Sequence, residues 1–279
     1  MIFKTLKDIP VNVLLESFNL SFSDYLVPFH LSKEQLENKM ASENIRPEFS
    51  SGAFDNEKLI GFILHGYDVV NNIKTVYNGG TGVIPSQRGH KLTSKLYQFI
   101  IPLLQREDIK KVQLEVIKEN TAALKVYENT GFHVERNLNC YRGKIEIKSR
   151  PTGFEIKPLT VYDWEELQNF WDWQPAWQNS ATAVSNLKET NTAAGAYKNN
   201  QLVGYIIYNP VTKRIQHFAV QKDHRNKGIG RQLFEYIALQ NNNELTLINI
   251  DGNAKDTNDF LAAIGLKTFI TQYEMIKLL

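Results

Sequence analysis

A strand–loop–helix pattern that occurs twice limits the fold of this chain more than any other feature. In the first copy, an apolar segment ends at Val83 and leads into a loop that contains Arg88 and Gly89. In the second copy, Val220 and Arg225 occupy the equivalent places, each 137 positions further along the chain. An amphipathic, helix-forming pattern follows both loops. Such a loop is a ready anion site, because the first helical N–H groups have no intrahelical partner and the helix dipole favours negative charge.

Length and composition set the broad class. A chain of 279 residues is long enough for two domains of about 100–150 residues each. Its 42% hydrophobic and 22% charged residues are typical of globular proteins. A net charge of +2 gives no strong basic patch of the kind that nucleic-acid binding usually needs, so we expect no nucleic-acid partner.

Cysteine usage and the apolar runs favour a cytoplasmic protein. The single cysteine, Cys140, excludes an internal disulfide and is interpreted as a small buried hydrophobic residue in a reducing compartment. The N-terminal residues do not have the apolar stretch of a signal peptide. No apolar run approaches the roughly 18 residues of a membrane span. We therefore expect a cytoplasmic location and no membrane partner. We also expect no metal site.

The elements around the two loops follow the same order in both halves. We expect the first half to contain the strands 2–6, 52–55, 59–66, 74–83, 111–117 and 132–147, and the helices 10–20, 32–41, 93–105 and 120–130. In the second half we expect the strands 154–159, 194–197, 202–208, 214–220, 244–250 and 267–278, and the helices 161–170, 181–189, 230–241 and 257–263. The Pro- and Gly-containing segment 149–153 is the expected boundary. The sequence therefore predicts an α/β (α+β) chain of two tandem domains, 1–148 and 154–279, each a mixed, mostly antiparallel sheet flanked by helices.

Each half resembles a domain of the GNAT superfamily of N-acetyltransferases. The signature of that family is a strand, then Arg/Gln-x-x-Gly-x-Gly/Ala, then a helix. The second half has it in full as Arg225-Asn226-Lys227-Gly228-Ile229-Gly230, and the first half has an altered form, Arg88-Gly89-His90-Lys91-Leu92-Thr93. The resemblance implies that acetyl-CoA is the cofactor. It also implies that the amides of each loop hold the coenzyme A pyrophosphate, with Val83 and Val220 beside the cofactor at the strand ends.

The altered first loop leaves two alternatives open. Lys91 and Thr93 stand where the signature has its two later glycines. Their side chains either point away from the phosphates, with Lys91 adding a positive charge, or crowd the pyrophosphate. A non-glycine residue in a left-handed conformation costs about 1–2 kcal/mol, which would weaken cofactor binding without abolishing it. A glycine-containing turn without a ligand is the plainer interpretation of either loop taken alone.

A second group of residues in the first half carries a candidate acid–base pair. Leu114-Glu115-Val116 is followed by Asn120, Ala123, Tyr127, Gly131 and Phe132. This spacing resembles the later part of the GNAT motif, Asn-x-x-Ala-x-x-x-Tyr-x-x-x-Gly-Phe, and is most similar to the ribosomal-protein alanine acetyltransferases. The resemblance implies that Glu115 is the general base, that Tyr127 is the general acid and that Asn120 belongs to the cofactor site.

The chemistry of amide formation needs such a pair. Aminolysis of a thioester requires the removal of a proton from the attacking ammonium and the delivery of one to the leaving thiolate. A tyrosine with a pKa of about 10 donates to a thiolate whose thiol has a pKa of about 8.5, a step about 2 kcal/mol uphill. Burial would raise the pKa of Glu115 toward that of a useful base. The plainer alternatives are a solvated Glu115, a core-packed Tyr127 and an Asn120 that only caps its helix.

The second half does not contain this pair. Alignment of the glycines that end the last helix of each half places Leu261 at the position of Tyr127 and Asn249 at that of Glu115. Neither replacement transfers a proton at neutral pH. His217 could serve as a base there, although a sheet histidine satisfied by its neighbours is the plainer interpretation.

The aromatic residues of the second half are clustered. All four tryptophans fall in one short stretch, as Trp164, Trp171, Trp173 and Trp177. Three roles are open for them: an aromatic wall of the acceptor site, a contact between the domains, or ordinary packing.

We interpret the whole chain as an acetyl-CoA-dependent N-acetyltransferase whose acceptor is a primary amine of a small molecule or a peptide. The alternative is a CoA-binding or regulatory module without turnover, and the oligomeric state is open.

Overall fold

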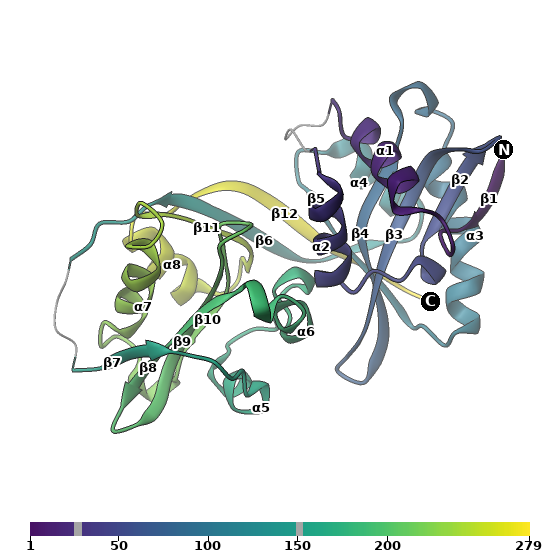
Figure 1. Ribbon diagram of the computed structural model, residues 1–279. Coiled ribbons are helices and arrows are strands. Elements are labelled where there is room, and N and C mark those ends of the chain that lie inside the picture. Colours follow the sequence, from purple (N-terminus) through teal and green to yellow (C-terminus); the bar gives the residue numbers. More distant parts are fainter. Residues whose placement is uncertain (25–29, 149–152) are drawn as a thin grey trace. The chain divides into compact units, whose positions relative to one another are not determined.

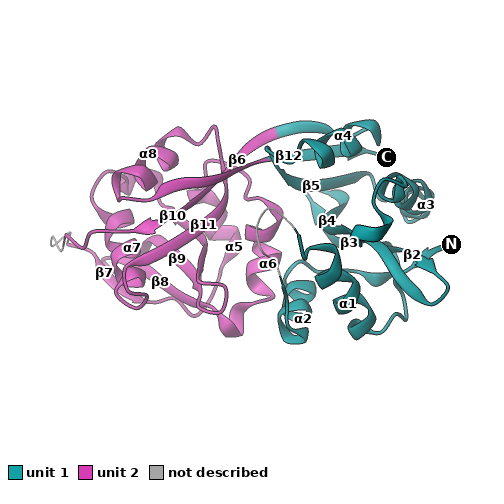
Figure 2. Cartoon of the chain, turned by 90° about the horizontal axis from the view of Figure 1, so that it is seen from above, with its two compact units in different colours: residues 1–135, 273–279 teal, residues 136–272 magenta. Residues whose placement is uncertain are grey.

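The computed structural model describes residues 1–24, 30–148 and 153–279. These residues form two compact units: unit 1 contains 1–135 and 273–279, and unit 2 contains 136–272 (Figure 2). The expected boundary at 149–153 lies mostly outside the described residues. The division differs from the expected 1–148 and 154–279 because two long strands, β6 (His133–Lys144) and β12 (Lys267–Leu278), are each divided between the units.

Unit 1 is a sheet with helices packed against it (Figure 1). Its strands are β1 (Ile2–Thr5), β2 (Ser51–Asp55), β3 (Lys58–Val70), β4 (Ile73–Val83) and β5 (Lys111–Ile117), followed in the sheet by β12. Its helices are α1 (Val11–Ser21), α2 (Lys33–Ser42), α3 (Leu92–Arg106) and α4 (Thr121–Asn129). The pairs from β1 to β4 are antiparallel, whereas β4 and β5 are parallel.

Strand β3 explains why this sheet is covered on both faces. Successive side chains of a strand point to opposite faces, so a strand without polar alternation needs an apolar layer on each side. Ile60 and Ile63 belong to a core cluster that contains the buried face of α3. Phe62 and Leu64 belong to a second cluster that contains Leu14 and Phe18 of α1.

Unit 2 repeats this plan. Its strands are β7 (Glu155–Pro158), β8 (Thr192–Lys198), β9 (Gln201–Asn209), β10 (Arg214–Val220) and β11 (Glu244–Asp251), followed in the sheet by β6. Its helices are α5 (Trp164–Leu167), α6 (Ala181–Ser185), α7 (Ile229–Ala238) and α8 (Lys255–Ala263). Only β10 and β11 are parallel among the strand pairs described in this unit. The predicted fold class, a mixed and mostly antiparallel sheet with flanking helices, is confirmed.

The first two helices of unit 2 are shorter than expected. The segment predicted as a helix over 161–170 is the four-residue α5 and a single 3₁₀ turn, Gln168–Phe170. Trp171 leaves the helical region with φ −78° and ψ 151°. Its ring then packs on a cluster that contains Phe170 and Tyr205, so aromatic packing, and not helical periodicity, sets the path of the chain here. Likewise, the helix expected over 181–189 ends at Ser185.

The closing strands of the two repeats are exchanged. β6 follows α4 in the chain, yet it pairs with β11 of unit 2, where Tyr141 joins the core. In unit 1 the strand next to β5 is β12, which follows α8, and Met275 is fully buried there. The main-chain N–H of Leu279 also donates to the carbonyl of Lys110 in unit 1, at 2.9 Å. Each sheet is therefore completed by a strand that the linear order of elements assigns to the other half.

Candidate functional site

A cavity of about 610 Å³ opens in unit 2 beside the second loop. β10 and β11 pair at Arg214–Thr246 and Ile215–Leu247, and the described residues form no further pairs between these strands. Beyond that point the strands diverge, and residues 216–220 of β10 and 249–250 of β11 line the cavity. The other walls come from the loop, from α8 and from the aromatic segment 170–173.

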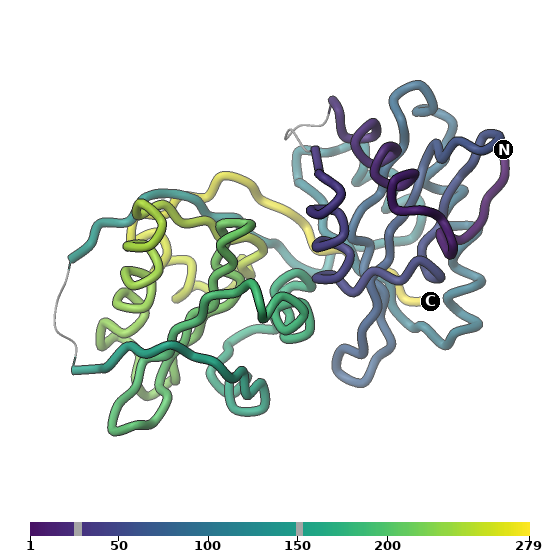
Figure 3. Tube along the Cα trace, in the orientation of Figure 1, coloured from purple at the N-terminus to yellow at the C-terminus, as the bar shows by residue number. Residues whose placement is uncertain are grey.

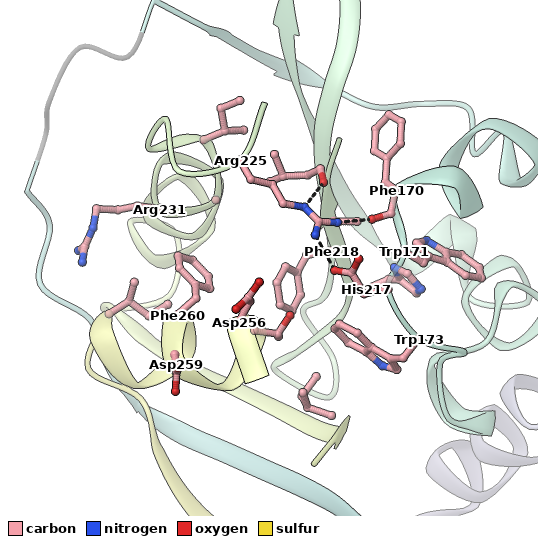
Figure 4. A pocket seen from close by; sticks show the side chains of 18 of the residues that line it. Phe170, Trp171, Trp173, His217, Phe218, Arg225, Arg231, Asp256, Asp259 and Phe260 are labelled. Atoms are coloured by element: carbon pink, nitrogen blue, oxygen red, sulfur yellow. Dashed lines mark hydrogen bonds and ion pairs between the residues drawn. The ribbon is translucent and has the colours of Figure 1, made fainter. Parts of the chain in front are cut away.

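The two ends of this cavity differ in chemistry, as Figure 4 shows. Arg231 lies at one end, on the helix that follows the loop. His217, Trp171 and Trp173 lie at the other end, and Arg225 lies between the two groups. The cavity therefore joins the predicted phosphate loop to an aromatic end that contains a histidine.

The second loop turns through two left-handed residues. Asn226 has φ 59° and Gly228 has φ 84°, and Gly228 is the N-cap of α7. This turn brings Arg225, Asn226, Gly228, Ile229 and Gly230 to the cavity wall, with Val220 on the preceding strand. Lys227 instead donates from Nζ to the carbonyl of Asp223, at 2.8 Å. The backbone N–H groups at the start of α7 are thus placed at a cavity large enough for an extended ligand.

Gly230 has a packing role rather than a conformational one. A Cβ at this position would lie 3.2 Å from the ring of Phe260 on α8. The missing side chain therefore allows close approach of α8 to α7. In unit 1, Thr93 replaces this glycine, and α4 carries the smaller Val126 at the place of Phe260. This correspondence favours a Thr93 side chain that faces α4 and leaves the loop amides open.

The first loop has the same backbone turn with the glycines at other positions. Gly89 has φ 82° and Lys91 has φ 57°, and Lys91 is the N-cap of α3. The left-handed residues of the two loops therefore coincide, but glycine occupies the first of them in one loop and the second in the other. Leu92 begins α3 and is buried, and the ring of His90 contacts the carbonyl of Gln87 through Nδ1 at 3.2 Å.

Both loop arginines are engaged by the protein. Arg225 donates from Nε to the carbonyl of Val220 at 3.0 Å and from Nη2 to that of Phe170 at 2.9 Å, and its Nη1 lies 2.7 Å from Asp172. Arg88 makes the equivalent contacts in unit 1. Its Nε donates to Val83 at 3.3 Å, its Nη2 donates to the carbonyl of Ser21 at 2.9 Å, and Asp24 accepts from both Nη atoms at 2.7 Å. The sequence pattern did not reveal this role, because these carbonyl and carboxylate partners lie up to 67 positions away.

The carboxyl group of Glu115 is buried. Tyr77 donates its hydroxyl hydrogen to Oε2, whereas Oε1 is buried and has no partner among the described residues. Burial raises the pKa of Glu115 to about 8, with smaller increases from Glu274 and Glu43. The hydrogen bond from Tyr77 opposes this shift. A solvated position on the strand face is therefore not what the structure has.

Tyr127 and Asn120 lie on the helix that follows β5. The ring of Tyr127 makes edge-to-face contacts with Tyr97 and Phe132, at centroid distances of 6.4 and 5.7 Å. These neighbours fix the orientation of the ring. Asn120 is the N-cap of α4, and its Oδ1 accepts from the main-chain N–H of Ala123 at 3.1 Å. Asn120 therefore caps this helix, and its place in the cofactor site stays a prediction.

The corresponding places in unit 2 hold different groups. Leu261 is fully buried in the core. Asn249 has φ 60° in a bulged part of β11, and its Oδ1 accepts from Gln272 Nε2 at 2.7 Å. His217 is 7% exposed, and its Nδ1 lies 2.9 Å from the hydroxyl of Tyr205. Its Nε2 has no partner among the described residues, so the histidine is satisfied at only one ring nitrogen.

Two of the tryptophans line the cavity, and the other two pack against neighbouring residues. Trp171 and Trp173 line the cavity. Trp177 is buried, and Trp164 donates from Nε1 to Ser185 Oγ at 2.8 Å while its ring packs on Trp171. Gln216, Phe218 and Phe260 also line the cavity, and no sequence motif indicated them.

Comparison with a family model covers both halves of the chain. Residues 14–132 and 159–248 match the model described as the acetyltransferase (GNAT) family. None of the helices in the described ranges has the length and apolar character that a membrane crossing would need.

Two curated relatives match parts of the chain. N-alpha-acetyltransferase 30 of Saccharomyces cerevisiae is 36% identical over 92 residues, which is 31% of this chain and 52% of that protein. Mycothiol acetyltransferase of Brachybacterium faecium is 28% identical over 117 residues, which is 41% of this chain and 35% of that protein. The chain thus spans about half or less of the length of these relatives.

Solved structures share the fold over the whole chain. A tandem GNAT protein from the clavulanic acid biosynthesis pathway has a TM-score of 0.72 at 13% identity, with 99% of this chain and 98% of that chain covered. An acetyltransferase of Pyrococcus horikoshii, described as putative, has a TM-score of 0.70 at 12% identity, with 100% and 89% covered. At these identities the likeness concerns the fold, and it confirms the tandem arrangement.

Proposed function

Because the chain belongs to the acetyltransferase (GNAT) family, we propose that it transfers the acetyl group of acetyl-CoA to a primary amine of a small molecule or a peptide. Acetyl-CoA is the acetyl donor of this family, as expected from the loops. The observation that carries the proposal is the buried Glu115 carboxyl group, which has a raised pKa and one oxygen without a hydrogen-bond partner among the described residues.

Glu115 acts as the general base of unit 1. A base works best when its pKa lies near the working pH, and a carboxyl group with a pKa of about 8 is close to that range. The hydrogen bond from Tyr77 holds Oε2, which leaves Oε1 to accept the proton of the attacking ammonium. A peptide α-amine also has a pKa of about 8, so this transfer is close to thermoneutral.

Tyr127 acts as the general acid, and the first loop holds the cofactor. The aromatic contacts of Tyr127 orient its ring, and its hydroxyl protonates the thiolate of coenzyme A as the tetrahedral intermediate collapses. The pyrophosphate binds the amides of the first loop, from Arg88 to Thr93. The thioester then lies near Gly82 and Val83, where main-chain amides stabilise the oxyanion. The second loop is a further coenzyme A site.

The acceptor is a small amine or a peptide α-amine rather than a lysine side chain. A lysine ammonium, with a pKa of about 10.4, holds its proton more than a hundredfold more tightly than an α-ammonium, with a pKa of about 8. The names of the two relatives point the same way, since one refers to mycothiol and the other to N-alpha acetylation.

Release of the free thiol of coenzyme A tests this function directly. We expect release with small amines or with peptides that have a free α-amine, and little with peptides whose only amine is an internal lysine. Glu115→Gln should lower kcat/KM by about a hundredfold or more, whereas the exposed Glu119→Gln serves as the matched control and should not. If no amine causes thiol release although coenzyme A binds, the alternative of a CoA-binding regulatory module is correct.

A further inference from the structure

His217 lies at the end of the unit 2 cavity that is far from Arg231 (Figure 4). The ring is covered on its faces by aromatic groups, with Trp171 at a centroid distance of 4.8 Å and Tyr205 at 5.6 Å. Its Nε2 is buried and has no hydrogen-bond partner among the described residues. A buried polar atom without a partner is costly, so its presence at a cavity indicates a bound group that satisfies it.

The hydrogen bonds around Tyr205 determine where the proton of His217 lies. Trp171 Nε1 lies 2.6 Å from the Tyr205 hydroxyl oxygen, and an indole N–H can only donate. Among the described residues, the hydroxyl contacts only this indole and His217 Nδ1, so its own hydrogen points to Nδ1. Nδ1 therefore accepts and carries no proton. A neutral imidazole has one N–H, so the proton lies on Nε2.

The imidazole is also neutral at physiological pH. Burial lowers the pKa of His217 to about 3. The charged or titratable side chains that line the same cavity are Asp172, His224, Arg225, Arg231, Asp256 and Asp259. Asp172 follows Trp171 in the sequence. Its carboxylate forms an ion pair with Arg225, whose Nη1 lies 2.7 Å from Oδ2. With Nδ1 occupied and Nε2 protonated, His217 has no lone pair for an amine proton, which excludes the base role considered for it.

We propose that the Nε2–H of His217 donates a hydrogen bond to the acyl carbonyl oxygen of an acyl-CoA held in unit 2. This assignment rests on the proposed function of the second loop as a coenzyme A site. The pyrophosphate lies at one end of the cavity, and the acyl end of the cofactor reaches the other, beside Trp171 and Trp173. A neutral N–H donor in an aromatic environment suits a neutral carbonyl oxygen, which needs no counter-charge.

Unit 2 then binds acyl-CoA without consuming it. Leu261 and Asn249 occupy the positions of the acid–base pair, and neither side chain transfers a proton to or from a reacting amine at neutral pH. Coenzyme A itself has no acyl carbonyl and leaves His217 unpaired. Unit 2 therefore binds acyl-CoA more tightly than coenzyme A. It acts as a sensor that reports whether the cofactor carries an acyl group.

Tryptophan fluorescence is a specific probe of this site, because all four tryptophans belong to unit 2. Full-length protein is titrated with acetyl-CoA and with coenzyme A. We expect acetyl-CoA to bind about three- to tenfold more tightly than coenzyme A, the worth of one added neutral hydrogen bond. Tyr205→Phe and His217→Leu should bring this ratio close to one, whereas His217→Gln, which keeps an amide donor, should retain part of it.

The matched control is Tyr208→Phe on the same strand. Its hydroxyl donates to Asn241 Oδ1 at 2.6 Å and lies outside the cavity lining, so the ratio should stay at the wild-type value. If both ligands bind equally to wild-type protein, the inference about His217 is wrong while the loop remains a coenzyme A site. If neither ligand changes the fluorescence, the proposed role of the second loop fails instead.

The tautomer of His217 gives a second, independent readout. Protein with ¹⁵N-labelled histidine should show His217 with a bare Nδ1 and a protonated Nε2 from about pH 5 to 8, with the signal assigned by its loss in His217→Gln. Acetyl-CoA should shift the Nε2–H signal more strongly than coenzyme A does. A protonated Nδ1, or an imidazolium in this pH range, would overturn the proposal.

Discussion

Arg88 and Arg225 make the same three-point contact, one in each unit. Each donates from Nε to the last carbonyl of the strand before its loop and from Nη2 to a carbonyl of the preceding helical segment. Each also pairs with an aspartate that follows that segment, Asp24 or Asp172. A planar guanidinium can hold three such partners at fixed directions, which a lysine ammonium cannot. The arginine of the loop signature therefore joins the loop to the helical segment, and the loop amides remain for the anion.

Replacement of each arginine by lysine tests this structural role. We expect Arg225→Lys to lower the free energy of unfolding of unit 2 by about 1–2 kcal/mol, since its two hydrogen bonds to main-chain carbonyls are partly buried. Arg88→Lys should cost unit 1 less than about 1 kcal/mol, because the Arg88 side chain is 43% exposed against 29% for that of Arg225. Urea denaturation followed by tryptophan fluorescence reports unit 2, and circular dichroism reports both units. Unchanged stability of Arg225→Lys combined with weaker coenzyme A binding would instead identify the guanidinium as a phosphate ligand.

Lys91→Gly should stabilise unit 1. Lys91 has φ 57°, which costs a non-glycine residue about 1–2 kcal/mol, although glycine also loses more backbone entropy on folding. The net gain is about 0.5–1 kcal/mol by chemical denaturation. The control is Lys95→Gly, four residues later within α3, which should destabilise by about 1 kcal/mol because glycine is a poor helix residue. Equal destabilisation by both changes would contradict the argument.

Local sequence patterns predicted the repeat well. The strand–loop–helix order and the cap at Asn120 follow from neighbouring residues, and the structure has both. The exchange of β6 and β12 was not predictable in this way. A strand pattern shows that Tyr141 or Met275 needs burial, but the core that buries it depends on partners more than a hundred positions away. The cavity also combines side chains from several distant elements, so the sequence indicated its loop, His217 and the tryptophans but not Gln216, Phe218 or Phe260 beside them.

Removal of residues 273–279 should destabilise unit 1 more than unit 2. These residues belong to unit 1, where Met275 is fully buried and Gln113 donates to Glu274 Oε2 at 2.9 Å. Met275→Ala alone should cost about 2–5 kcal/mol, and Met275→Leu less than about 1.5 kcal/mol. In a chain that ends at Gln272, the tryptophan fluorescence transition of unit 2 should persist while the circular dichroism signal shows loss of unit 1. A loss confined to the tryptophan transition would contradict the strand exchange.

The stability of the protein should depend on pH through Glu115. Burial raises the pKa of Glu115 from an ordinary value near 4.5 to about 8. Between these values the folded state binds more protons than the unfolded state, so this contribution to stability is present at low pH and is lost as pH rises toward 8. Glu115→Gln should remove a slope of up to about 1.4 kcal/mol per pH unit from the unfolding free energy.

The difference between variant and wild type isolates this group. His65 and His217 have pKa values lowered by burial to about 4 and about 3, and they change stability in the opposite direction as pH rises. Those contributions are common to both proteins and cancel in the difference. Glu119→Gln, at an exposed site beyond the same strand, should leave the pH dependence as in wild type. If the free energies of unfolding of wild type and Glu115→Gln depend on pH in the same way, the Glu115 carboxyl group is solvated.

Tyr127→Phe should separate the acid role from the packing role of this side chain. Phenylalanine keeps the ring that contacts Tyr97 and Phe132, so the free energy of unfolding should change by less than about 1 kcal/mol. Loss of the hydroxyl removes the proton donor for the leaving thiolate, and kcat should fall by about tenfold or more with little change in the KM for acetyl-CoA. Tyr67→Phe is the control, since that ring packs on Phe49 in the same unit and its hydroxyl has no part in the proposed chemistry. The contrary outcome is a wild-type kcat for Tyr127→Phe under conditions where Glu115→Gln is impaired. That result would show that Tyr127 only packs in the core and that the proton donor is another group in unit 1.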